Sequence, residues 1–162
     1  MFDAIGDLPL HPLVVHAVVV GIPLALLLAV LFALPRFRST ARWPLAVVAV
    51  GSAVLTIVAK ESGEGLRRAL GLVPGNPVGD LITQHEALAQ QLAWMTVVVA
   101  VLAVLNVVLV SRGAENKTVD RVLPVVLIVA ALLATIWVVR TGDIGSRAVW
   151  NPTGGTVYTN GG

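Results

Sequence analysis

Cysteine is absent from this chain of 162 residues. Its absence excludes disulfide bonds, thiolate zinc sites, cysteine-ligated iron–sulfur clusters, covalently attached haem and thiol nucleophiles. A metal site would therefore have to use histidine or carboxylate ligands. Charge is also scarce, because 12% of the residues are charged against about 25% in a typical soluble domain. The composition thus argues against a water-soluble globular protein.

Basic patches and familiar catalytic motifs are missing as well. The net charge is only +2, and no basic run is interleaved with aromatic residues, which argues against a nucleic-acid partner. Metalloprotease, phosphate-loop and Gly-x-Ser-x-Gly signatures do not occur. The first apolar segment follows Asp3 and Asp7 rather than basic residues. We therefore expect it to be a retained membrane span and not a cleaved signal peptide.

Apolar residues dominate the chain, at 57%. They gather in four segments, at 13–34, 43–59, 87–110 and 122–139, each close to the ~20 residues that a membrane-crossing helix needs. We predict an all-α membrane protein, with one domain over 1–162 forming a four-transmembrane-helix bundle with short cytoplasmic loops. Residues 60–86 are expected as a long polar loop, and 141–162 as an irregular C-terminal tail on the membrane surface. No internal repeat is evident.

The orientation follows from the basic residues at the span ends. An even number of spans places both termini on one side of the membrane. The turns on the other side, 35–42 and 111–121, are short and basic, with Arg36, Arg38, Arg42, Arg112, Lys117 and Arg121. Positive residues favour the cytoplasmic side. We therefore expect a multi-pass protein of the cell membrane with both termini extracytoplasmic.

Polar groups are concentrated on the side of the termini. All three histidines, His11, His16 and His85, lie there, together with seven of the nine acids. We call this end of the bundle the histidine end. Polar side chains at membrane depth are costly, so such a cluster is a candidate functional site.

Two of these histidines are the first candidates for ligands. His16 lies one to two turns inside the first span and His85 begins the third. Imidazoles from two helices suit a b-type haem, whereas a transition-metal ion could add Glu64 as a ligand. His11, at the surface, is an accessory cofactor-binding candidate. In the alternative interpretations His16 donates to a backbone carbonyl or a carboxylate and orders the bundle, His85 is a membrane-interface histidine in water, and His11 is only a helix-start residue.

Other charged residues at the same end have supporting roles in this hypothesis. The acids Glu61, Glu86 and Asp143 are candidate second-shell partners that would orient the histidines. The cations Lys60, Arg67 and Arg140 could receive haem propionates.

Several segments resemble one known family. They are Leu8-Pro9-Leu10-His11-Pro12-Leu13-Val14-Val15-His16 with Gly21-Ile22-Pro23, then Glu61-Ser62-Gly63-Glu64, Gln84-His85-Glu86, and residues 140–150 from Arg140-Thr141-Gly142-Asp143 to Trp150. In this order they resemble the bacterial membrane proteins of domain of unknown function 2231, in particular the actinobacterial branch.

The resemblance implies a four-helix membrane domain from a family without an established activity. Some relatives are joined to Rieske iron–sulfur domains, which implies a link with electron transfer. By resemblance, His11, His16, Glu64 and His85 occupy polar positions of the family. Asp143 stands where relatives often carry histidine, so a ligand from the fourth span is missing in this chain.

The leading functional hypothesis is a membrane protein that binds a b-type haem or a transition-metal ion near its outer face and serves electron transfer. Its expected partners are the lipid bilayer and a redox protein or another membrane subunit, and a homo-oligomer is a further expectation. The alternative is a non-catalytic structural or interaction subunit of a membrane complex. A metal-dependent intramembrane hydrolase is a third hypothesis, although no helix carries paired ligands four residues apart.

Overall fold

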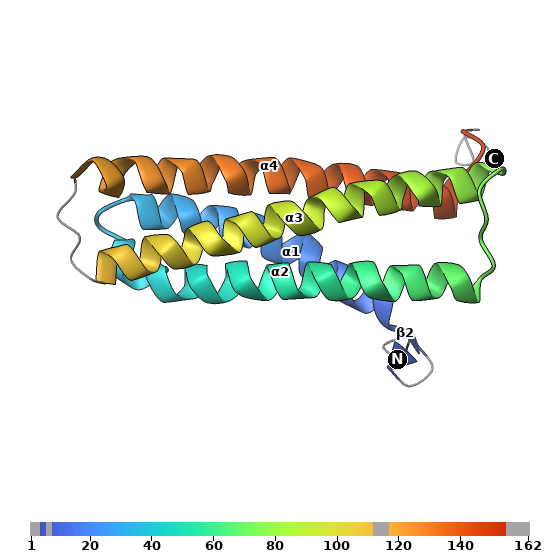
Figure 1. Cartoon of the computed structure of the whole chain (residues 1–162), viewed down its shortest axis with the longest axis horizontal. Helices are drawn as coiled ribbons and strands as arrows, with labels where there is room; N and C mark the ends of the chain where they lie inside the picture. The colour runs from blue at the N-terminus through green and yellow to red at the C-terminus, as the bar shows by residue number, and fades with distance from the viewer. Residues whose placement is uncertain (1–3, 6–7, 112–116, 155–162) are drawn as a thin grey trace, which may run out of the picture.

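Four long α-helices form the part of the chain that the structure describes. The computed structural model describes residues 4–5, 8–111 and 117–154. Its helices are α1 (Leu10–Ala33), α2 (Arg38–Ala69), α3 (Pro77–Ser111) and α4 (Lys117–Trp150). Two strands of two residues each, β1 (Ala4–Ile5) and β2 (Leu8–Pro9), pair antiparallel ahead of α1. Successive helices run in opposite directions (Figure 1), which confirms the expected all-α four-helix bundle.

The helices pack in a ring. The main interfaces join α1 to α2, α2 to α3, α3 to α4, and α4 back to α1. The helices α1 and α3 are therefore diagonally opposite. The start of α1, the link between α2 and α3 and the end of α4 lie at the same end of the bundle (Figure 1). This is the histidine end, as the count of four spans predicts.

Small residues fill the core, and large apolar residues cover the outside. Buried alanines such as Ala25 and Ala29 let neighbouring helices approach closely. Valine, leucine and tryptophan side chains such as Val47 and Trp94 are exposed on the outer faces. All four helices are long and apolar enough to cross a membrane, and such an exterior suits hydrocarbon rather than water. The protein is therefore a multi-pass membrane protein that lies in a lipid bilayer.

Three of the helices are longer than a bilayer is thick. The helices α2, α3 and α4 have 32, 35 and 34 residues, or roughly 48–52 Å at 1.5 Å per residue, whereas the hydrocarbon layer is about 30 Å. The excess lies mainly at the histidine end, where residues 60–69, 77–86 and 140–150 continue beyond the apolar segments.

The expected polar loop at 60–86 is largely helical. The helix α2 continues to Ala69, and Gly71 then takes a positive φ of 62° that suits glycine at a helix end. The amide of Leu72 donates to the carbonyl of Arg67 at 3.2 Å and closes this turn. Only residues 70–76 link α2 to α3. The predicted loop is longer because its bounds are the ends of the apolar segments, which mark the membrane edge and not the helix ends.

The start of α3 has its own capping residues. The Asn76 Oδ1 accepts from the amide of Gly79 at 2.9 Å, and Asp80 Oδ1 accepts from the amide of Gly75 at 2.9 Å. Proline at position 77 opens the helix, where its missing N–H costs nothing. A Cβ on Gly79 would overlap the carbonyl oxygen of Val73, so this turn requires glycine.

The C-terminal segment also differs from the expected irregular tail. The helix α4 continues through Thr141 and ends at Trp150. Thr141 and Ala148 are buried, and Asp143 pairs with Arg147 at 3.0 Å one turn later. Packing against the other helices thus extends α4 beyond its apolar part. Residues 155–162 of the expected tail lie outside the described residues, as do Asp3, Asp7 and Arg112.

Candidate functional site

His11 is held by the neighbouring helix α2. Its Nδ1 is 2.8 Å from the carbonyl oxygen of Ala59. Because a carbonyl only accepts, Nδ1 carries the proton, and the Nε2 of a neutral ring keeps its lone pair. One turn further along α2, Gly63 lies against the ring, since a Cβ there would come 2.9 Å from His11 Cε1. The imidazole is thus fixed by one hydrogen bond and by the absence of a side chain.

His85 is held by α4 in the same way. Its Nδ1 is 2.9 Å from the carbonyl oxygen of Thr141, so this nitrogen also donates and Nε2 keeps its lone pair. A Cβ on Gly145 would come 3.0 Å from His85 Cε1 and Nδ1. Both the carbonyl and the glycine belong to the part of α4 that the sequence predicts as irregular tail. The extended helix therefore provides half of this site.

The two rings meet across the bundle. The ring centres of His11 and His85 are 6.2 Å apart, and their planes are nearly perpendicular at 87°. Because these residues come from the diagonally opposite helices α1 and α3, the pair lies over the bundle axis. The carbonyls that hold the rings belong to Ala59, the last residue of the second apolar segment, and Thr141, just after the fourth. The pair therefore lies at the membrane boundary.

His16 is not part of this pair. Its side chain is exposed on the outside of the bundle, and its Nδ1 contacts the Pro12 carbonyl of its own helix at 2.6 Å. Five residues of an α-helix turn through about 500°, which leaves His16 roughly 140° away from His11. Since His11 faces the axis, His16 faces outward. The sequence-based pairing of His16 with His85 is thus replaced by the contact between His11 and His85.

The acidic candidates bind cations instead of histidines. Lys60 Nζ donates to Glu64 at 2.6 Å and to Glu61 at 3.1 Å. Glu86 on α3 forms an ion pair with Arg67 on α2, and Asp143 pairs with Arg147. The sequence predicts Glu61, Glu86 and Asp143 as the groups that orient the histidines. In the structure His11 and His85 donate instead to the Ala59 and Thr141 carbonyls.

The described residues do not assemble a ligand set of three or more side chains. Within the described parts of the chain, no group of three histidines or acids is close enough to hold a metal ion. His16, His85 and Glu64 therefore do not form the predicted set. The expected propionate partners are also engaged, because Lys60 and Arg67 pair with acids and Arg140 lies 4.9 Å from the ring centre of Trp137.

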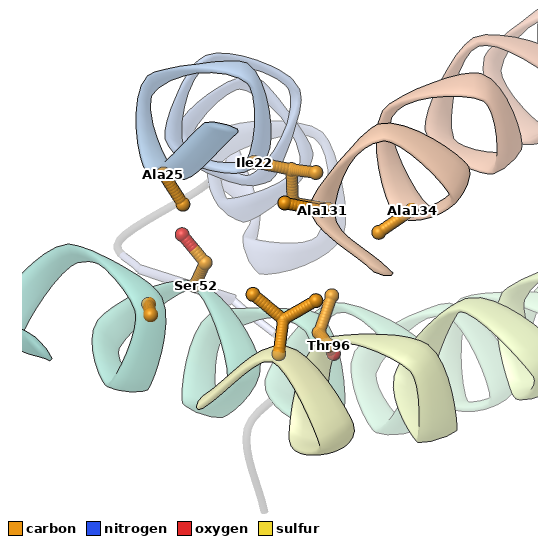
Figure 2. Close-up of a pocket in the computed structure, with 8 residues that line it drawn as sticks. Ile22, Ala25, Ser52, Thr96, Ala131 and Ala134 are labelled. Carbon is orange, nitrogen blue, oxygen red and sulfur yellow. The ribbon is translucent and has the colours of Figure 1, made fainter. Parts of the chain in front are cut away.

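The middle of the bundle contains a small cavity. Side chains from all four helices line a cavity of about 10 Å³ there, roughly the space of one water molecule. Figure 2 shows Ile22, Ser52 and Thr96 around this space, with alanines from α1 and α4. This cavity is far smaller than a porphyrin and lies about three helical turns from His11 along α1.

Sequence reasoning missed the four backbone features that shape the site. The Ala59 and Thr141 carbonyls leave no signal in a sequence, because every residue has a carbonyl group. Gly63 and Gly145 leave a weak one, because each is a glycine in a segment that is helical in the structure. A glycine in a helix interior costs about 1 kcal/mol relative to alanine, which is a reason to look for a close neighbour.

Long apolar helices, short links and an apolar outer surface define a multi-pass helical membrane protein. A family model described as "Predicted membrane protein (DUF2231)" matches residues 7–157. The chain belongs to this family, which confirms the resemblance of its sequence segments. None of the curated proteins and none of the solved structures matches the chain significantly.

Proposed function

We propose that this membrane protein binds a transition-metal ion, or the iron of a b-type haem, through His11 and His85, and that the bound metal serves electron transfer. One observation carries the proposal: each ring donates Nδ1–H to a backbone carbonyl of the adjacent helix, which leaves an Nε2 lone pair on each neutral ring. Metal-ligating histidines almost always donate their second ring nitrogen in this way.

The spacing of the rings is within reach of a single ion. Metal–nitrogen bonds are about 2.0–2.1 Å long, and the ring centres are 6.2 Å apart. Imidazole nitrogen suits copper, iron, zinc and nickel, of which copper and iron carry electrons. Two protein ligands would leave positions for water or for a group from a redox partner.

The composition of the purified protein tests this proposal. Protein expressed with ample haem precursor, iron and copper is expected to retain about one metal ion per chain in metal analysis. Haem would instead give a Soret band in the absorption spectrum. Protein that shows neither a stoichiometric metal nor a Soret band, even after reconstitution with copper or iron, would remove the proposal.

A structural role is the second candidate, and the edge-to-face contact of the rings favours it. His11 and His85 join two diagonal helices, and both rings already have a backbone partner. In this role the pair closes the histidine end of a non-catalytic subunit. Replacing the pair would then lower the stability of the bundle, whereas the metal content of the wild type would already be negligible.

The site is proposed to face the outside of the cell, with both termini on that side. At the other end lie Arg36 in the α1–α2 turn and Arg38 and Arg42 at the start of α2, and basic residues favour the cytoplasm. A phosphatase that is active only outside the cytoplasm, fused after Gly162, is therefore expected to be active. The same fusion in the turn at 35–37 should be inactive. The reverse pattern of activities would contradict this orientation.

A further inference from the structure

The two histidines are held by the same arrangement twice. His11 donates to Ala59 and lies on the glycine four residues later, whereas His85 donates to Thr141 and lies on the glycine four residues later. In each case the histidine lies on the first helix of a hairpin and its partner lies on the second helix. The hairpin of α1 and α2 thus repeats as the hairpin of α3 and α4.

The same repeat extends through the core. Several buried residues of α1 have a buried equivalent in α3, at the same separation in the sequence as His11 and His85. Several buried residues of α2 likewise have a buried equivalent in α4, at the same separation as Ala59 and Thr141. The pairs are Val18 with Leu92, Ile22 with Thr96, Ala25 with Val99, Ala29 with Ala103, Phe32 with Asn106, Leu45 with Leu127, Ala49 with Ala131, Ser52 with Ala134 and Thr56 with Val138.

The central cavity lies on the axis of this repeat. Its lining consists of four of these equivalent pairs, Ile22 with Thr96, Ala25 with Val99, Ala49 with Ala131 and Ser52 with Ala134 (Figure 2). Few of the pairs are identical residues, which explains why no repeat is evident in the sequence. The packing positions and the two histidine anchors are what the hairpins share.

We propose that the histidine pair is a two-fold symmetric site in which Gly63 and Gly145 are equivalent positioning residues. The metal-binding part of this inference rests on the proposed function, whereas the placement of the rings does not. A Cβ at either glycine would press on the Nδ1–Cε1 edge of the facing ring. That edge carries the hydrogen bond, so a methyl group would push the ring away from its carbonyl.

Alanine substitutions at the two glycines test the proposal. Gly63→Ala and Gly145→Ala are expected to remove the Nδ1–H tautomer signature of the facing ring in ¹⁵N NMR of histidine-labelled protein. Each should also weaken copper binding about 10–100-fold, the usual effect of losing an outer-shell partner. Gly142→Ala is the matched control on α4, because no atom lies within 4 Å of a Cβ there.

Three results would overturn the inference. One is a wild-type tautomer signature in both glycine variants. Another is a clear effect in one variant and none in the other, which contradicts the symmetry. The third is loss of helicity in a glycine variant while Gly142→Ala folds, which shows a packing role rather than ring placement. If wild-type protein binds no metal, the proposed function fails, but the NMR signals still decide where Gly63 and Gly145 place the rings.

Discussion

His11→Ala and His85→Ala are each expected to weaken metal binding by at least about 100-fold, the upper end of the cost of losing an outer-shell partner. Either change removes one of the two imidazoles at the bundle axis, and the described residues offer no group of three histidines or acids as a replacement. Titration of the purified variants with copper, followed by calorimetry or optical spectra, measures the change in affinity.

His16→Ala is the control for these variants. The ring of His16 is exposed and contacts only the Pro12 carbonyl of its own helix among the interactions found in the described structure. We therefore expect wild-type affinity and a wild-type spectrum. A large loss of binding in His16→Ala with normal binding in His11→Ala would show that His11 and His85 are not the ligand pair.

Phe32→Ala is expected to have the largest effect on stability. The ring of Phe32 is 0% exposed, and the Arg38 guanidinium lies 5.6 Å from its centre. Replacing a buried phenylalanine by alanine typically costs 3–5 kcal/mol in soluble proteins. In a membrane the separated helices remain in lipid, so the solvent-transfer part shrinks and the lost packing remains. We expect about 3 kcal/mol, at the lower end of that range.

Unfolding in mixed detergent micelles, driven by a denaturing detergent and followed by circular dichroism, measures this free energy. Leu34→Ala is the matched control, because Leu34 lies two residues further on and is exposed on the outside. It should change the free energy of unfolding by less than about 1 kcal/mol, as surface substitutions usually do. Equal losses in the two variants would contradict the placement of Phe32 in the core.

The four helices and their common end could be predicted because apolar length is a strong signal. A segment such as 87–110 has few alternatives to crossing the membrane. The helix ends could not be predicted from that signal, since they depend on caps and packing. Asn76 caps α3 eleven residues before its apolar segment begins, and buried Thr141 and Ala148 continue α4 beyond its own.

The candidate site was predictable in part. The concentration of histidines at one end indicates where to look, and His85 and His11 were both among the candidates. The choice between His11 and His16 requires the rotation of α1, which the strongly apolar sequence on all sides of this helix does not reveal. The roles of Ala59 and Thr141 depend on backbone carbonyls. The acids at this end are easier to identify in the sequence, but in the structure they form ion pairs with Lys60, Arg67 and Arg147.

The diagonal position of the histidine pair has a thermodynamic consequence. A ligand held by both rings would join the α1–α2 hairpin to the α3–α4 hairpin, and this link is lost when the hairpins separate. Ligand binding to the assembled state alone stabilises it, by about 2.7 kcal/mol at a ligand concentration of 100 times Kd. Ligand bound to the histidine pair would then increase the resistance of the whole bundle to unfolding, even though the ligand contacts only one end.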